Sequence, residues 1–114
     1  MVIYITTMDM LNEIQRCFRN GKALYTRHAR EEMQKEIFGR IREEEVFETI
    51  MKGEVVEEYE NDKPYPSMLI SGRTDNERQL HVVCAYSVED DLAIVVTVYQ
   101  PDPNLWIDYR RRKR

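Results

Sequence analysis

The residues that mark specialised protein classes are scarce in this chain of 114 residues. It has two cysteines, four glycines, four prolines, one tryptophan and two histidines. Two cysteines form at most one bridge, so a disulfide framework is excluded, and we expect two buried thiols in a reducing cytoplasm. No apolar run approaches the roughly 18 residues that span a bilayer, and the start, MVIYITTMDM, lacks a basic leader. These absences predict a cytoplasmic protein with no membrane partner.

Metal and nucleotide sites also lack their usual motifs. The cysteines and histidines match a zinc tetrahedron in number, but no CxxC or HxxxH spacing occurs. Cys84 and His81 would also point to opposite faces of one strand. No glycine-rich phosphate loop and no GxSxG motif is present. We therefore expect neither a metal nor a cofactor.

Charge is distributed unevenly along the chain. Hydrophobic residues make up 42% and charged residues 33%, a balance typical of a folded protein, and the length predicts a single domain over residues 1–114. There are 17 basic and 21 acidic residues, and the last five positions, 110–114, are all basic. The other 109 positions therefore carry 12 basic and 21 acidic residues, a net charge of −9. We expect an acidic body with a disordered basic tail at 110–114.

Hydrophobic periodicity changes from helical to alternating near residue 54. Apolar residues at helical spacing predict helices at about 8–20, from Thr26 through Ile37, and at 42–52. Alternation then predicts strands at about 54–60, 67–73, 78–87 and 92–100, separated by short turns. A short helix is expected at 104–109. The fold class is α+β: N-terminal helices packed on one face of a four-stranded antiparallel meander, followed by a short C-terminal helix and the basic tail.

Strand alternation separates a core face from a polar face. On the third strand, Leu80, Val82, Cys84 and Tyr86 form the predicted core set, with His81 on the other side. On the fourth strand, the fully apolar set is Leu92, Ile94, Val96 and Val98, and the opposite set is Ala93, Val95, Thr97 and Tyr99. We expect the fully apolar sets to lie under the helices.

The turn positions predict which polar residues become neighbours. A hairpin centred on residues 89–91 places His81 opposite Tyr99 and Val83 opposite Thr97. A hairpin centred near Asn76 places Ser71 opposite His81, with Arg73 one pair further along. The sequence therefore predicts one polar cluster on three neighbouring strands, made of Ser71, Arg73, His81, Thr97 and Tyr99.

Four stretches of the sequence carry a resemblance to a known family: TRHAREEM, GEVVEEYENDKPYPSMLISGRT, RQLHVVCAYS and IVVTVYQPDPNLW. They resemble the family called domain of unknown function 4258, over about residues 22–112. That family name implies no activity. The chain is similar, more distantly, to the RelE-like and BrnT-like toxin nucleases, small cytoplasmic proteins that cleave RNA without a metal. Arg42 departs from the Ser or Thr expected as the cap of the third helix.

The cluster and the resemblance lead to the same first hypothesis, a metal-independent ribonuclease. Attack by the 2′-hydroxyl of RNA needs a base, an acid and a cation for the phosphorane charge. His81 and His28 would share the proton transfers, Arg73 would bind the phosphate with help from Arg27, and Tyr99 would orient the histidine or stack on a base. Ser71 and Thr97 would complete the substrate-binding face. An antitoxin-like protein is a possible partner by the same resemblance.

The same residues also have a purely structural interpretation, which supports a second hypothesis. A strand histidine is more often a hydrogen-bonded structural residue than a catalyst, and His28 has Glu31 and Glu32 within helical reach. Arg73 can pair with acids of the adjoining turn. Because a body at −9 repels RNA, the alternative is a non-catalytic regulatory or protein-interaction module on the same scaffold.

Overall fold

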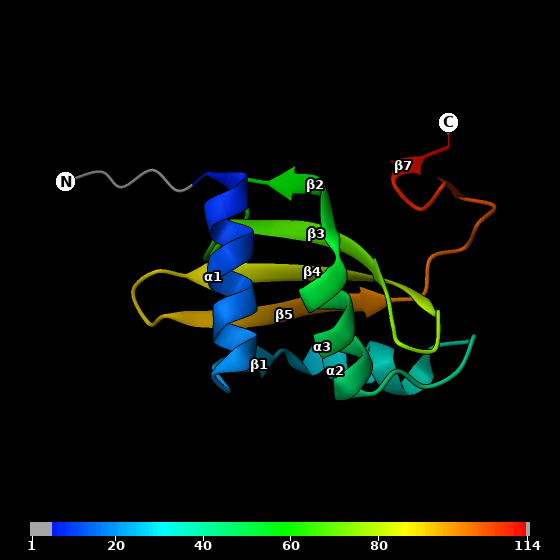
Figure 1. The fold of residues 1–114 in the computed structure, drawn as a ribbon, viewed down its shortest axis with the longest axis horizontal. Coiled ribbons are helices and arrows are strands. Elements are labelled where there is room, and N and C mark those ends of the chain that lie inside the picture. The colour runs from blue at the N-terminus through cyan, green and yellow to red at the C-terminus, as the bar shows by residue number, and fades with distance from the viewer. Residues whose placement is uncertain (1–5, 114) are drawn as a thin grey trace.

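Three helices lie mostly before the strands of a five-stranded sheet, in a computed structural model that describes residues 6–113. The elements are α1 (Thr7–Arg19), β1 (Ala23–Tyr25), α2 (Arg27–Lys35), α3 (Glu43–Lys52), β2 (Glu54–Tyr59), β3 (Ser67–Arg73), β4 (Gln79–Ser87), β5 (Leu92–Tyr99), β6 (Trp106–Ile107) and β7 (Arg111–Arg112). In Figure 1, α1 and α3 cross the front of the sheet. The α+β class and the approximate places of the three helices and the four long strands are as the sequence predicts.

The helices bury one face each against the sheet. Leu11, Ile14, Cys17 and Phe18 of α1 are buried, as are Ala29 and Met33 of α2. They join strand residues such as Leu80, Val82 and Cys84 in one hydrophobic core. Cys17 and Cys84 are free, buried thiols, as predicted. None of the described helices is long and apolar enough to cross a membrane.

The second helix ends earlier than the periodicity predicts. α2 stops at Lys35, and Ile37 lies outside it with 87% of its surface exposed. Two glutamates of this region instead hold the edge of β5, because Glu32 accepts a hydrogen bond from the Val98 amide and Glu36 accepts one from the Gln100 amide. These carboxylates satisfy backbone donors that no neighbouring strand reaches.

The sheet is mixed, which corrects the prediction of a four-stranded antiparallel meander. Its strand order is β1-β5-β4-β3-β2, and β1 pairs with β5 in parallel while the other pairs are antiparallel. β1 has only three residues, too few for an alternating pattern to be recognised. Its partner lies about 70 residues later in the chain, so only the tertiary structure reveals the pairing.

A β-bulge reverses the predicted faces of most of β5. The register runs His81 to Tyr99 and Val83 to Thr97, and then shifts so that Cys84 faces Val95. One extra residue inverts the alternation. The buried set is therefore Ala93, Val95 and Val98, while Leu92, Ile94 and Val96 are only half-buried. The prediction that Leu92, Ile94 and Val96 form the core face was wrong, and only Val98 of that set lies in the core.

The C-terminal residues form a small hairpin, where the sequence predicts a short helix and a disordered tail. β6 and β7 pair with each other, and Asp108 and Tyr109 between them have positive φ, which a right-handed helix does not allow. Tail residues Arg110 and Arg112 form ion pairs with Glu54 and Glu57 of β2. We call residues 101–113 the strap. Residue 114, the last of the predicted tail, lies outside the described residues.

Candidate functional site

His81 is the third residue of β4 and lies on the face opposite the helices, with the neighbours that strand alternation predicts. Ser71 of β3 is its partner on one side and Tyr99 of β5 is its partner on the other. Arg73 is one pair further along, opposite Gln79. Because the bulge begins beyond Val83, it leaves this part of the predicted register intact.

Both ring nitrogens of His81 make hydrogen bonds within the protein. Nε2 lies 2.8 Å from the carbonyl oxygen of Tyr109, and Nδ1 lies 3.0 Å from the hydroxyl of Tyr99. A carbonyl only accepts, so Nε2 carries the proton. In the neutral ring, Nδ1 then accepts the hydrogen bond that the Tyr99 hydroxyl donates.

The strap covers this histidine completely. The Trp106 ring packs edge-on against His81 at 4.5 Å between centroids, and His81 has no exposed surface. Ser71 donates a second hydrogen bond to the Tyr109 carbonyl at 3.2 Å, and Gln79 in turn donates to the Ser71 hydroxyl at 2.8 Å. The predicted polar cluster therefore exists at Ser71, His81 and Tyr99, but the strap covers it, so His81 is not accessible to solvent.

Burial lowers the pKa of His81 below its ordinary value of 6.5. The hydrogen bond to the Tyr109 carbonyl and the charge of Glu57 act in the opposite direction, and Arg112 adds to the lowering. At neutral pH His81 is therefore uncharged. Burial also raises the pKa of Tyr99, so its hydroxyl keeps its proton.

We expect this neutral histidine to make folding stability fall below neutral pH. Since the unfolded chain binds a proton near pH 6.5 and folded His81 binds one only at lower pH, its contribution is complete above 6.5 and is lost as the pH falls. The slope reaches at most about 1.4 kcal/mol per pH unit. Urea unfolding between about pH 7.5 and pH 5.5 measures it, and His81→Gln should flatten the dependence. An equally steep loss in His81→Gln would contradict the assignment.

Arg73 is near the cluster but outside its hydrogen-bond network. Its side chain lines a cavity of about 430 Å³ together with Ser71, Gln79 and Tyr109. The structure gives Arg73 no ion pair among residues 6–113, although Asp75 and Glu77 follow it closely. Asp75 pairs instead with Lys52. The Arg73 guanidinium remains available to an anion.

The predicted residues of α2 are separate from His81. His28 has 66% of its side chain exposed and lies 3.4 Å from Glu32, and Arg27 is 94% exposed and pairs with Glu31. Within the described part of the chain, no hydrogen bond or ion pair joins His28 to His81. His28 and Tyr99 are among the residues that line one open hollow. Thr97 faces Val83 on the same side of the sheet as His81 and is partly exposed.

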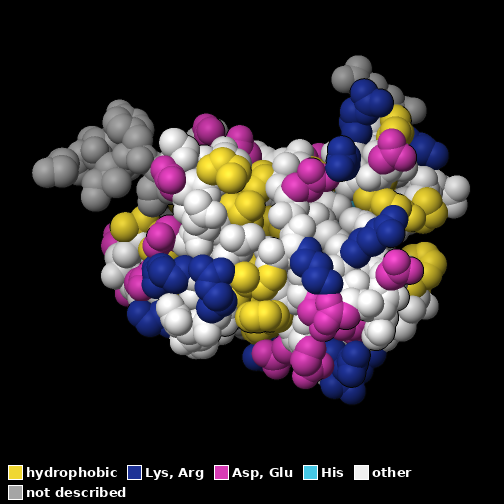
Figure 2. Space-filling view, in the orientation of Figure 1, with side chains coloured by type: hydrophobic (Ala, Val, Ile, Leu, Met, Phe, Trp, Pro, Cys, Tyr) yellow, Lys and Arg dark blue, Asp and Glu magenta, His cyan; other side chains and the backbone are white. Residues whose placement is uncertain are grey.

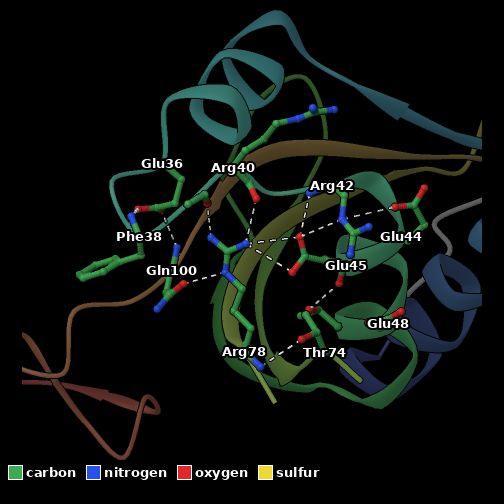
Figure 3. A network of polar contacts seen from close by, with 12 residues as sticks. Glu36, Phe38, Arg40, Arg42, Glu44, Glu45, Glu48, Thr74, Arg78 and Gln100 are labelled. Atoms are coloured by element: carbon green, nitrogen blue, oxygen red, sulfur yellow. Dashed lines mark hydrogen bonds and ion pairs between the residues drawn. The ribbon is translucent and has the colours of Figure 1, made fainter. Parts of the chain in front are cut away.

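Sequence reasoning missed a second polar network, around Arg78 (Figure 3). Arg78 contacts Glu45 of α3, the side chain of Gln100 and the carbonyls of Gly39 and Arg40. Glu45 is buried although it is charged, and it accepts a hydrogen bond from the Arg42 amide. This bond satisfies the backbone amide of Arg42, the N-cap residue of α3, whose guanidinium cannot accept a hydrogen bond as a Ser or Thr hydroxyl would. Trp106 and Tyr109 were missed too, because the sequence predicts a short helix at 104–109 and no local pattern shows that this segment packs over His81.

The chain thus belongs to the α+β proteins that pack helices on one face of a mixed sheet, with a polar cluster on the other face. Residues 25–100, more than half of the chain, match the family described as Domain of unknown function (DUF4258), and the chain belongs to that family. Comparisons with curated proteins and with solved structures gave no match. Among residues 6–113, no three His, Cys, Asp or Glu side chains are grouped to hold a metal ion.

Proposed function

We propose that this chain is a non-catalytic protein-interaction module in which His81 is a structural residue. The observation that carries the proposal is the state of His81, which is buried, neutral and bonded at both nitrogens. A general acid or base must come within hydrogen-bonding reach of the proton that it moves. The Tyr109 carbonyl and the Tyr99 hydroxyl occupy both positions through which His81 would do so.

The distribution of charge supports the same proposal. Figure 2 shows acidic and basic side chains interspersed on the helix-covered face, with hydrophobic side chains in a stripe between α1 and α3. On the other side of the molecule, two of the tail arginines are already paired with glutamates. RNA binding relies on unpaired basic side chains gathered against the phosphates. An acidic protein with paired arginines is better suited to a protein partner.

A metal-independent ribonuclease is the second candidate, and the position of Arg73 favours it. Its guanidinium is unpaired within residues 6–113 and lies beside Ser71 and Gln79 in a polar cavity, as a phosphate-binding arginine would. In this alternative, the chain resembles the RelE-like and BrnT-like toxins, His28 and His81 transfer protons, and an antitoxin is the partner. His81 then acts only when the strap is displaced.

An RNA cleavage assay distinguishes the two proposals. We expect the wild-type chain to leave a mixed RNA substrate intact in EDTA across a salt series, at a rate within about twofold of a protein-free blank. Arg73→Ala and His28→Ala are the matched variants, because both side chains are on the surface and their removal leaves the core unchanged.

The contrary outcome is equally clear. If the wild-type chain cleaves RNA and either variant, purified identically, loses about a hundredfold or more of that rate, the chain is a ribonuclease. Cleavage that all three proteins share equally would be assigned to a contaminant and would leave the chain non-catalytic.

A further inference from the structure

The strap is attached to the sheet in the way that a bound peptide is attached to its receptor. In the described part of the chain, the turn and loop backbone hydrogen bonds of residues 101–113 lie within the strap. The Lys113 amide donates to the Leu105 carbonyl, and the Arg110 amide donates to the Ile107 carbonyl. β6 and β7 form their own two-stranded sheet and do not extend the five-stranded one. The match to the family ends at residue 100, where the strap begins. The strap therefore lies outside the residues that match the family, and side chains of the sheet hold it in place.

One aromatic side chain anchors the strap. Trp106 is 5% exposed and packs at 90° to the His81 ring, and the Arg112 guanidinium carbon lies over the Trp106 ring, 4.6 Å from its centroid. Aromatic residues in fully desolvated pockets supply most of the affinity in protein interfaces. The neighbouring apolar side chains of the strap, Leu105 and Ile107, are exposed. Trp106 is thus the buried anchor among them.

Two donors fixed by the sheet converge on one backbone oxygen of the strap. The His81 Nε2 and the Ser71 hydroxyl both donate to the Tyr109 carbonyl. Tyr99 orients the histidine and Gln79 orients the serine, so this pair of donors is built by the sheet itself. Asp108 and Tyr109 form the turn of the strap at positive φ, so a partner segment with a similar turn would present its carbonyl to the same donors.

Acidic side chains on β2, at the edge of the sheet, bind the arginines of the strap. Glu54 and Glu57 of β2 pair with Arg110 and Arg112 of the strap at 2.6 Å and 3.0 Å. Both arginines are mostly exposed, so the pairs lie at the rim of the interface. Opposite charges at the rim favour this partner, and like charges placed opposite each other there would repel a wrong one.

We propose that this face of the sheet is a recognition site for a hairpin segment of a partner protein, with an aromatic anchor followed by arginines, and that the strap is its built-in competitor. The proposal rests on the proposed function and gives the module its partner class. The partner carries the chemistry of the strap, since the anchor pocket, the two carbonyl donors and the two glutamates define it. While the strap is seated, the partner's apparent affinity is reduced by the fraction of molecules in which the site is open.

The experiment uses the full chain with Trp106→Ala, which weakens the strap at its anchor. The chain has one tryptophan, so this variant has none. A synthetic peptide of residues 101–113 then contains the only tryptophan in the mixture, and its emission reports on the peptide alone. We expect the peptide emission to shift to shorter wavelength with saturable binding. Anisotropy of a dye-labelled copy should show binding to the wild-type chain about tenfold weaker or more, because its own strap competes.

A charge-reversed peptide is the matched control. The same peptide with Arg110→Glu and Arg112→Glu should bind the Trp106→Ala chain about tenfold more weakly than the unchanged peptide does. Adding Glu54→Lys and Glu57→Lys to the Trp106→Ala chain should restore the binding of the charge-reversed peptide. Where Trp106→Ala does not fold by circular dichroism, the full chain with Arg110→Glu and Arg112→Glu replaces it, since these changes are at the surface. This chain keeps Trp106, so anisotropy of the dye-labelled peptide is then the readout.

Absence of saturable peptide binding to a folded, strap-weakened chain would overturn the inference, as would equal binding of the charge-reversed peptide. A concentration-dependent dimer of the wild-type chain in sedimentation would assign the site to the strap of a second copy instead and would also overturn it. None of these results bears on RNA cleavage, which the separate RNA assay measures. Failure of this inference is therefore distinguishable from failure of the proposed non-catalytic function.

Discussion

Replacing Arg78 by alanine lowers the free energy of unfolding by about 3 to 5 kcal/mol, because it removes the buried cation of Glu45 and leaves that carboxylate only the more exposed Arg42, 3.7 Å away. The Arg78 and Glu45 side chains are only 16% and 7% exposed, with 3.3 Å between them. Figure 3 shows how many elements the guanidinium joins. It donates to Gln100 at 2.7 Å, to the Arg40 carbonyl at 2.9 Å and to the Gly39 carbonyl. A single side chain thus holds the loop before α3, the start of α3 and the residue that precedes the strap.

Chemical denaturation measures the loss, with Arg27→Ala as the matched control. Arg27 also forms an arginine–glutamate pair, but both side chains are mostly exposed, so its removal should change stability by less than about 0.5 kcal/mol. The double change Arg78→Met with Glu45→Leu should recover part of the loss, since it removes both buried charges together. A loss in Arg78→Ala no larger than in Arg27→Ala would show that the network does not stabilise the fold.

Substituting Gly53 with alanine costs about 3 kcal/mol, although its backbone conformation suits any residue. A Cβ at Gly53 would lie 2.5 Å from the Thr49 carbonyl oxygen, 2.6 Å from the Ile70 side chain and 3.0 Å from the Ser71 carbonyl oxygen. Two of these atoms belong to the backbone, which cannot turn away. α3 and β3 approach closely here because neither Gly53 nor the facing Gly72 has a side chain. The substitution would therefore separate α3 from the strand that carries Ser71.

Gly21 provides the comparison, because it separates the effect of packing from that of backbone conformation. A Cβ at Gly21 meets nothing within 4 Å, but its φ is +70°. Gly21→Ala should thus cost only the conformational penalty of about 1 kcal/mol. Thermal unfolding of both variants measures the difference. If Gly53→Ala is neutral or stabilising, as restricting the unfolded chain alone would make it, the close approach is not a constraint.

Short-range signals explain why so much of the fold could be predicted. The stripe of Leu11, Ile14 and Phe18 and the run of Val46 and Ile50 are helical patterns complete within a dozen residues. The hairpins around Asn76 and Glu89 set the register that brings Ser71 and Tyr99 beside His81. Each of these predictions needs only the residues between two neighbouring elements.

Other features depend on contacts that no local pattern contains. The β5 bulge leaves no mark in the sequence LAIVVTVY, since either alternating set can face the core. The pairing of β1 with β5 and the ion pairs of Arg110 and Arg112 with β2 join residues far apart in the chain. For the same reason, the strap could not be predicted to cover His81.

By itself, the sequence determined the approximate places of the three helices and the four long strands, the antiparallel register of β3, β4 and β5 around His81, and the side of β4 on which His81 lies. Helix and strand periods and turn residues are local properties, which is why these features could be predicted. The tertiary structure decided whether that histidine meets solvent. Trp106 and the Tyr109 carbonyl come from more than 20 residues later in the sequence, and they cover the polar cluster that the sequence predicts to be open. Burial and two filled hydrogen bonds then make His81 neutral and structural, a state that depends on what is packed against it and not on its place in a strand.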